Sequence, residues 1–83
     1  MLSQDEQIAL GAKLIRISEE EARLGASFLE SDGALYVCQS GKGGRAIIVG
    51  NDGTVLYADS SVDWRTHERA YASGRRTPLN AFE

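Results

Sequence analysis

The sequence predicts an α+β fold: an N-terminal amphipathic helix, a four-stranded (at least three-stranded) antiparallel β-meander, and a C-terminal helix with a short irregular tail. Three observations predict this order. Apolar residues recur at helical spacing through residues 8–22, two pairs of apolar runs are each joined by a loop ending in Asp-Gly, and a segment with an aromatic stripe follows. We expect one small domain over residues 1–83, because this length supports a single core.

The composition narrows the class of protein. Hydrophobic residues make up 42% and charged residues 25% of the chain, as in ordinary soluble domains. The net charge of −3 does not favour nucleic acid or an anionic membrane, and no apolar run approaches the roughly 18 residues that span a bilayer. The acidic amino terminus lacks the segments of a signal peptide, and the single cysteine, Cys38, cannot form an internal disulfide. We therefore expect a reducing, cytoplasmic setting.

The first predicted element is a helix over residues 4–24. Ser3 and Glu6 have the spacing of a capping box, and one apolar stripe continues through the whole segment. Gly25 suits the left-handed residue that ends a helix. The alternative is a break at Ser18, where Glu21 would complete a second capping box.

Two hairpins are predicted to follow the helix. Each has a three-residue loop ending in Gly, which suits a type I turn closed by a left-handed glycine. The polar, glycine-rich residues 40–44 join the hairpins, and Ala26-Ser27 could instead extend the helix. The expected strands are Ala26–Glu30 and Ala34–Gln39 around Ser31-Asp32-Gly33, then Arg45–Gly50 and Thr54–Asp59 around Asn51-Asp52-Gly53.

The last predicted helix starts near Ser60 or Ser61 and runs to Ser73, before Gly74. We interpret Asp63 as a favourable charge near the positive end of the helix dipole. Pro78 marks an irregular tail. The apolar stripe of this helix is narrow, and the tail holds two large apolar residues: the stripe is Trp64, His67 and Tyr71, and the tail residues are Leu79 and Phe82.

Strand alternation makes both faces of the predicted sheet apolar. The first helix can cover one face, but the narrow stripe of the second covers the other poorly. A second copy of the chain, another protein or the tail could cover the remainder; alternatively, the two helices cover opposite faces and the tail fills the gap. In the first hairpin, one face is expected to carry Leu29, Leu35 and Val37, and the other Phe28, Tyr36 and Cys38. In the second hairpin, one face is expected to carry Ala46, Ile48, Leu56 and Ala58, and the other Ile47, Val49, Val55 and Tyr57.

No residue pattern predicts catalysis, a cofactor or a metal site. The segment Gly41–Arg45 leads into a strand and lacks the spacing of a phosphate-binding loop, so a hairpin connection is favoured. Cys38 and His67 could form a thiol–imidazole pair, but no third residue that would orient them is evident. No cysteines or histidines have the spacing of metal ligands. We therefore expect a protein that is not an enzyme.

Basic and aromatic residues instead predict an interaction surface. Arginines cluster around the last helix, and arginine and aromatic side chains are frequent in protein interfaces. The same cluster could contact nucleic acid phosphates, which is the alternative. The residues expected to contact a partner are Phe28, Tyr36, Tyr57, Trp64, Arg65, Arg69, Tyr71, Arg75 and Arg76.

The order of strand, Asp-Gly turn, strand and capped helix over residues 45–71 resembles small bacterial toxin-immunity domains. The resemblance implies a small inhibitor that binds its target stoichiometrically. We expect a non-enzymatic protein-interaction domain, acting as a homodimer or as a binder of another protein, such as an immunity protein or a phage-encoded antagonist.

Overall fold

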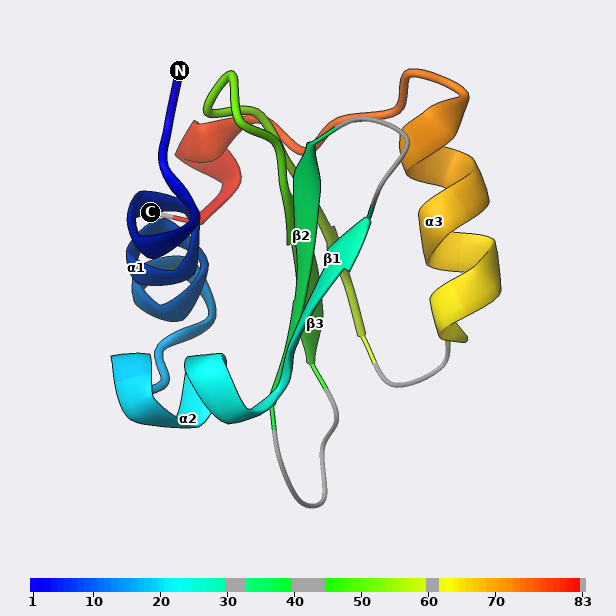
Figure 1. Ribbon diagram of the computed structural model, residues 1–83. Helices are drawn as coiled ribbons and strands as arrows, with labels where there is room; N and C mark the ends of the chain where they lie inside the picture. Colours follow the sequence, from blue (N-terminus) through cyan, green and yellow to red (C-terminus); the bar gives the residue numbers. More distant parts are fainter. Residues whose placement is uncertain (30–32, 40–44, 60–61, 83) are drawn as a thin grey trace.

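The computed structural model describes residues 1–29, 33–39, 45–59 and 62–82, and it confirms the α+β fold (Figure 1). The four strands lie in the order β1-β2-β3-β4, and each neighbouring pair is antiparallel. The sheet is therefore a meander, as predicted. Its strands are β1 (Ala26–Leu29), β2 (Ala34–Cys38), β3 (Ala46–Val49) and β4 (Val55–Ala58).

The N-terminal segment forms two helices, α1 (Gln4–Ile15) and α2 (Glu19–Leu24), so the prediction of one helix over residues 4–24 is wrong. The predicted capping box of Ser3 and Glu6 begins α1. Arg16 adopts a left-handed conformation with φ of 60°, and the Ser18 side chain accepts a hydrogen bond from the Glu21 N–H. The alternative break at Ser18 is correct because this local cap competes with continuation of the helix.

Gly25 is not left-handed, contrary to the prediction; its φ is −99°. A side chain at this position would overlap the Cys38 carbonyl, so glycine is required for the close approach of two backbones. The Gly25 carbonyl accepts hydrogen bonds from the Cys38 N–H and Sγ, both at 3.4 Å. These contacts fix the point where α2 passes into β1.

The register of the first hairpin differs by one residue from the prediction. Phe28 pairs with Leu35 and Leu29 pairs with Ala34, so four residues separate the strands instead of three. Because paired residues share a face, Phe28 lies on the face of Leu35 and Val37, and Leu29 lies on the face of Tyr36. The predicted faces of both residues are therefore wrong. Gly33 is left-handed as expected (φ 64°), while residues 30–32 of the predicted strand end and turn lie outside the described residues.

The second hairpin has the predicted register. Gly53 is left-handed with φ of 87° and closes the three-residue loop. All four β3 residues are buried, which confirms that both faces of this strand are covered. The pairs are Ala46 with Ala58, Ile47 with Tyr57, Ile48 with Leu56 and Val49 with Val55.

The last helix is α3 (Trp64–Ala72), and it begins later than predicted. Asp63 is its N-cap: the carboxylate accepts a hydrogen bond of 2.7 Å from the Thr66 N–H. Asp63 therefore caps the helix in the role predicted for Ser60 or Ser61, residues that lie outside the described chain. Gly74 follows the helix with a left-handed φ of 99°.

The helices form layers on opposite faces of the sheet: α1 and α2 on one side, α3 on the other (Figure 1). Gln7 ties α1 to the sheet, because its buried amide donates hydrogen bonds of 2.9 Å to the carbonyls of Gly33 and Val49. The C-terminal turn η1 (Leu79–Phe82) lies on the α1 side, where the Phe82 ring meets Tyr57 edge-on. The tail thus adds to the cover of the α1 face and leaves the α3 face to α3.

Candidate protein-binding groove

The α3 face is left partly uncovered over β1 and β2. α3 packs mainly on β3 and β4; toward β2 its His67 meets Tyr36, and Trp64 at its start borders the hollow over β1 and β2. The result is a groove of about 570 Å³. We call it the β1–β2 groove; its lining residues are Ser27, Phe28, Leu29, Tyr36, Cys38 and Trp64.

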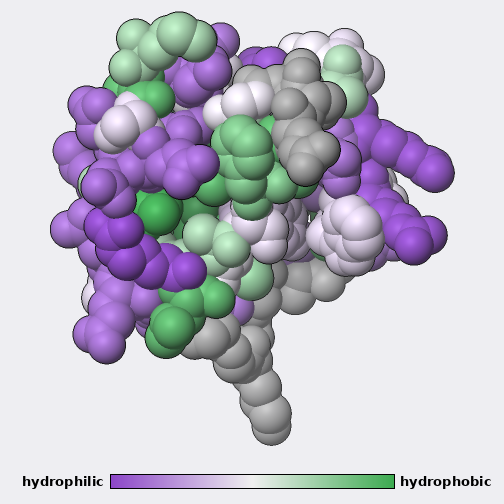
Figure 2. Space-filling view, in the orientation of Figure 1, coloured by the Kyte–Doolittle hydropathy of each residue, from purple (hydrophilic) through white to green (hydrophobic). Residues whose placement is uncertain are grey.

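Two half-exposed aromatic residues line the groove. Trp64 is 54% exposed at the start of α3, and Phe28 is 50% exposed at the sheet edge, where its pairing with Leu35 places its side chain on the α1 face. Between them, the exposed Ser27 pairs with Tyr36, and its small side chain leaves the sheet surface hollow. Figure 2 shows apolar and near-neutral surface in the middle of the molecule, between more hydrophilic surfaces on either side.

Trp64 is positioned by the cap of α3. The hydrogen bonds from Thr66 lower the pKa of Asp63, so the carboxylate that fixes the first turn stays ionised. The Arg65 guanidinium lies 5.5 Å from the centre of the Trp64 ring, within cation–π range. Trp64 also borders a second hollow with Arg65, Glu68 and Arg69. The indole is therefore a ridge between an apolar groove and a basic helix surface.

Tyr36 forms part of the groove wall and also contacts the core. Its ring meets His67 edge-on, with the ring centres 5.5 Å apart. Burial raises the pKa of the Tyr36 hydroxyl, and the charges of Cys38 and Asp63 raise it further. The hydroxyl is therefore neutral at physiological pH and offers a polar atom at the rim of an apolar surface.

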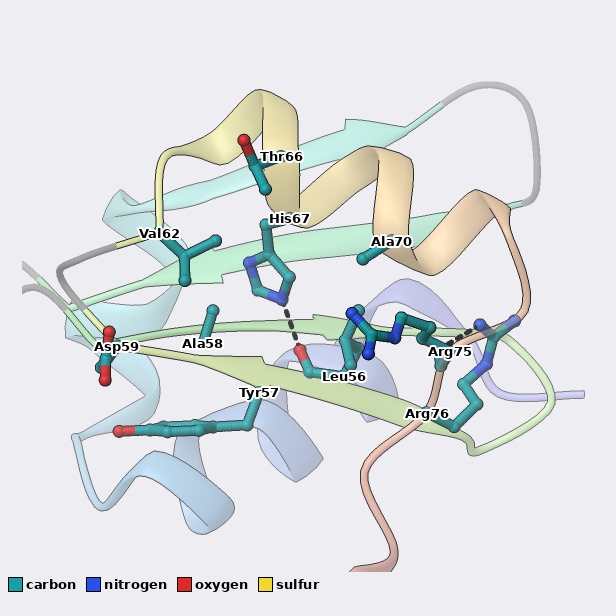
Figure 3. Close-up of a pocket in the computed structure, with 10 residues that line it drawn as sticks. All are labelled: Leu56, Tyr57, Ala58, Asp59, Val62, Thr66, His67, Ala70, Arg75 and Arg76. Atoms are coloured by element: carbon teal, nitrogen blue, oxygen red, sulfur yellow. Dashed lines mark hydrogen bonds between the residues drawn. The ribbon is translucent and has the colours of Figure 1, made fainter.

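A different hollow, of about 400 Å³, lies between α3 and β4 (Figure 3). His67 projects from α3 toward β4, and its Nε2–H donates a hydrogen bond of 2.6 Å to the Leu56 carbonyl. The carbonyl can only accept, so the proton is assigned to Nε2. His67 Nδ1 is buried and has no hydrogen-bond partner among the described residues, and burial lowers the pKa of the imidazole. His67 is therefore a neutral, packed histidine.

Cys38 and His67, considered together in the sequence as a possible pair, line different hollows. Cys38 belongs to the β1–β2 groove, and its thiol contacts the Gly25 carbonyl. Across the part of the chain that the structure describes, no three histidine, cysteine or acidic side chains lie close enough to hold a metal ion. Within the same residues, no helix has the length and apolarity needed to cross a bilayer.

The structure brings together only some of the residues expected to contact a partner. Phe28, Tyr36 and Trp64 all line the groove, with the Phe28 side chain turned to the α1 face, and Arg65 lies beside Trp64. Tyr57 packs against the tail on the opposite face. The remaining residues, Arg69, Tyr71, Arg75 and Arg76, lie away from the groove lining.

Arg76 has an internal structural role. Its guanidinium lies 3.7 Å from the centre of the buried Tyr71 ring and donates hydrogen bonds to the Tyr71 carbonyl and the Thr54 hydroxyl. Arg75 lines the α3–β4 hollow, whereas Arg69 borders the basic hollow next to Trp64. The four arginines therefore fall into two pairs: Arg65 and Arg69 border the hollow next to Trp64, and Arg75 and Arg76 line the hollow between α3 and β4.

The groove residues that sequence reasoning missed are Ser27, Leu29 and Cys38. Ser27 carried no signal because it is small and polar. Leu29 was assigned to the opposite face because a three-residue loop was assumed. The close approach of Gly25 to Cys38 sets the register, and it depends on a tertiary contact that the local sequence does not reveal.

Searches of family models, curated proteins and solved structures found no match to this chain.

Proposed function

We propose that this protein is a non-catalytic protein-interaction domain that binds another protein through the β1–β2 groove. One observation carries the proposal: Trp64 is half exposed beside a groove over β1 and β2 that no described helix covers. Together with Tyr36 it forms an aromatic surface on the α3 face, beside Arg65.

Leaving this surface in water forgoes part of the stabilisation that burial would give. A large apolar side chain gains roughly 1.5–3 kcal/mol on full burial, and the half-exposed Trp64 beside the groove gains only part of it. Tryptophan, tyrosine and arginine are also the residue types that contribute most to binding at protein interfaces. A partner that covers the groove would complete the burial that α3 leaves unfinished.

The small size of the domain suits a stoichiometric inhibitor, such as an immunity protein or a phage-encoded antagonist, and a second copy of the chain is another possible partner. Nucleic-acid binding through the arginines is the alternative. This alternative predicts that short oligonucleotides bind at low salt and that Arg65→Ala and Arg69→Ala weaken this binding.

The test is selection of random dodecapeptides displayed on phage, with the wild-type protein as bait. We expect the enriched peptides to lose at least about 2 kcal/mol of binding free energy, roughly thirtyfold in Kd, in the Trp64→Ala variant. The matched control is Leu24→Ala, because Leu24 is an exposed apolar residue on α2, outside the groove. It should bind the peptides as the wild type does.

Two outcomes would overturn the proposed function. One is that no peptide is enriched and light scattering shows a monomer. The other is that Trp64→Ala and Leu24→Ala change the affinity equally, which would place the binding surface elsewhere.

A further inference from the structure

The two edges of the sheet differ in how their backbone groups are used. At the β4 edge, Thr77 forms an isolated bridge with Val55, and its N–H donates a hydrogen bond of 2.7 Å to the Val55 carbonyl. The Thr77 hydroxyl accepts a hydrogen bond of 2.9 Å from the Tyr57 N–H. The C-terminal segment therefore occupies the β4 edge.

Among the described residues, no segment pairs with the outer edge of β1. The one strand beside β1 in this part of the chain is β2. Gly25 and Cys38 face each other directly and are joined by a backbone hydrogen bond. In an antiparallel pair, hydrogen-bonded and non-hydrogen-bonded positions alternate. Ser27 and Leu29 therefore bond to β2, whereas Ala26 and Phe28 direct their N–H and C=O groups away from it.

The sequence of β1 does little to discourage pairing. Protected edges often carry charged side chains, proline or a bulge, and the segment Ala-Ser-Phe-Leu has none of them. Its short length is the one protective feature, since four residues offer few bonding positions. This edge is therefore open to a short, specific pairing.

The edge and the groove are continuous. Ser27, Tyr36, Ile48 and Leu56 form one row across the α3 face, as the paired registers show. α3 packs over Ile48 in this row, and Ser27 is the last residue of the row at the β1 edge. A residue of an added strand opposite Ser27 would extend this row and place its side chain over the hollow beside Tyr36.

We propose that an extended segment of the partner protein adds to β1 as a fifth strand and places a large apolar side chain in the β1–β2 groove. This inference rests on the proposed function and specifies its binding mode. Unpaired backbone donors and acceptors along an edge are satisfied by another extended backbone, and pockets for alternate side chains then give specificity.

Charge complementarity defines the partner segment further. Arg65 and Arg69 lie in the hollow on the other side of Trp64 with Glu68, and both interact electrostatically with the nearby Asp63 carboxylate, although neither lies within ion-pair distance of a described carboxylate. A partner segment that crosses the groove toward Trp64 is therefore expected to carry an acidic residue next to its apolar one. Arginine binds carboxylates through two parallel hydrogen bonds.

A second copy of this chain is the less favourable occupant. Two β1 strands of four residues would share a contact about 14 Å long and roughly 10 Å deep. Such a contact buries on the order of 300 Å² over both partners, far below the roughly 1,200–2,000 Å² of stable interfaces. A longer segment from another protein can continue past β1 and also fill the groove.

The test compares two substitutions at Phe28 in binding to the peptides selected on the wild-type protein. Phe28→Pro removes the outward N–H, and Phe28→Ala keeps it; both remove the ring. The bond from β1 to β2 is spared in both, because Phe28 does not donate to β2. Circular dichroism and urea unfolding check that both variants fold, and Ala26→Pro removes the other outward N–H while retaining Phe28.

We expect Phe28→Pro to bind about tenfold more weakly than Phe28→Ala, because a partner carbonyl loses its donor. Ala26→Pro should also weaken binding. The selected peptides should alternate apolar and polar residues. Equal binding by Phe28→Pro and Phe28→Ala, or apolar residues at helical spacing in the peptides, would overturn strand addition.

The two proposals fail differently. If Trp64→Ala abolishes binding while Phe28→Pro and Phe28→Ala bind equally, the groove binds a partner without strand addition. If Trp64→Ala binds normally, the proposed function itself is wrong. A concentration-dependent dimer that Phe28→Pro disrupts and Phe28→Ala retains would make the occupant a second copy and overturn the assignment to another protein.

Discussion

The two faces of this sheet carry similar apolar residues but are covered to different extents. On one face, α1, α2 and the C-terminal turn enclose a core that includes Ile15, Ile47 and Val49. On the other, α3 packs its Tyr71 with Ile48 over β3 and β4, and the β1–β2 groove stays open. Neighbouring strands are about 4.8 Å apart and a helix is about 10 Å wide, so one helix covers about two strands.

Under the proposed function, this difference separates stability from binding within one small chain. The enclosed face holds the domain together, and the open half of the other face is available to a partner. Substitutions on the enclosed face should therefore change mainly stability, whereas substitutions at the groove should change mainly binding.

The largest expected effect is on the core residues of β3. Ile47 and Ile48 are neighbours in sequence, both fully buried, and they point to opposite faces. Replacing either by alanine should lower the free energy of unfolding by about 2–5 kcal/mol, as measured by urea denaturation. We expect Ile47→Ala to cost more, because its face has more covering elements. A cost below about 1 kcal/mol for Ile48→Ala would show that α3 does not pack tightly on this face.

A pH dependence should come from His67 on the α3 face. Because burial lowers its pKa in the folded protein, the unfolded chain binds a proton first as the pH falls. The stabilisation is fully present above the unfolded pKa of about 6.5 and declines as the pH drops through the lowered value. Each unit of pKa difference corresponds to about 1.4 kcal/mol.

The control for His67 is His67→Gln, whose unfolding free energy should change less between about pH 7 and pH 5 than that of the wild type. Urea unfolding at each pH measures both proteins. Identical pH profiles would contradict the assignment of this dependence to His67.

A smaller effect is expected at the closed edge of the sheet. Thr77→Val removes the hydroxyl that accepts from the Tyr57 N–H, at a cost of about 1 kcal/mol. Amide hydrogen exchange at Tyr57 should accelerate, whereas exchange at Phe28, on the open edge, should already be fast in the wild type. Strong protection of the Phe28 amide in the free monomer would refute the contrast between the edges.

The smallest effect on stability is expected at Trp64. Because its side chain is half exposed, Trp64→Ala should lower the unfolding free energy by less than about 1 kcal/mol while removing peptide binding. Tyr71→Ala, at a buried position on the same helix, is the comparison and should cost about 3 kcal/mol or more. Similar losses in the two variants would mean that Trp64 belongs to the core.

The sequence predicted the elements of the fold better than the site. Alternation in β3 and β4 and the left-handed Gly53 were sufficient for the second hairpin. The apolar stripe continues through Ser18, so the pattern favoured one helix over residues 4–24 instead of the break that the structure shows.

The groove could not be predicted from the sequence for two physical reasons. Its floor depends on the register of β1, which the contact between Gly25 and Cys38 sets. Its opening depends on where α3 lies across the sheet, and a narrow stripe does not specify that. Phe28, Tyr36 and Trp64 were expected to contact a partner, but only the structure brings them together.

Fluorescence of Trp64, the only tryptophan of the chain, tests the central claim most directly. In the free protein the half-exposed indole should emit at long wavelength and be quenched by iodide. Saturation with a selected peptide should shift the emission to shorter wavelength and protect it from iodide, because the partner covers the groove. A peptide that binds and leaves both emission and quenching unchanged would contradict the claim that this groove is the binding surface.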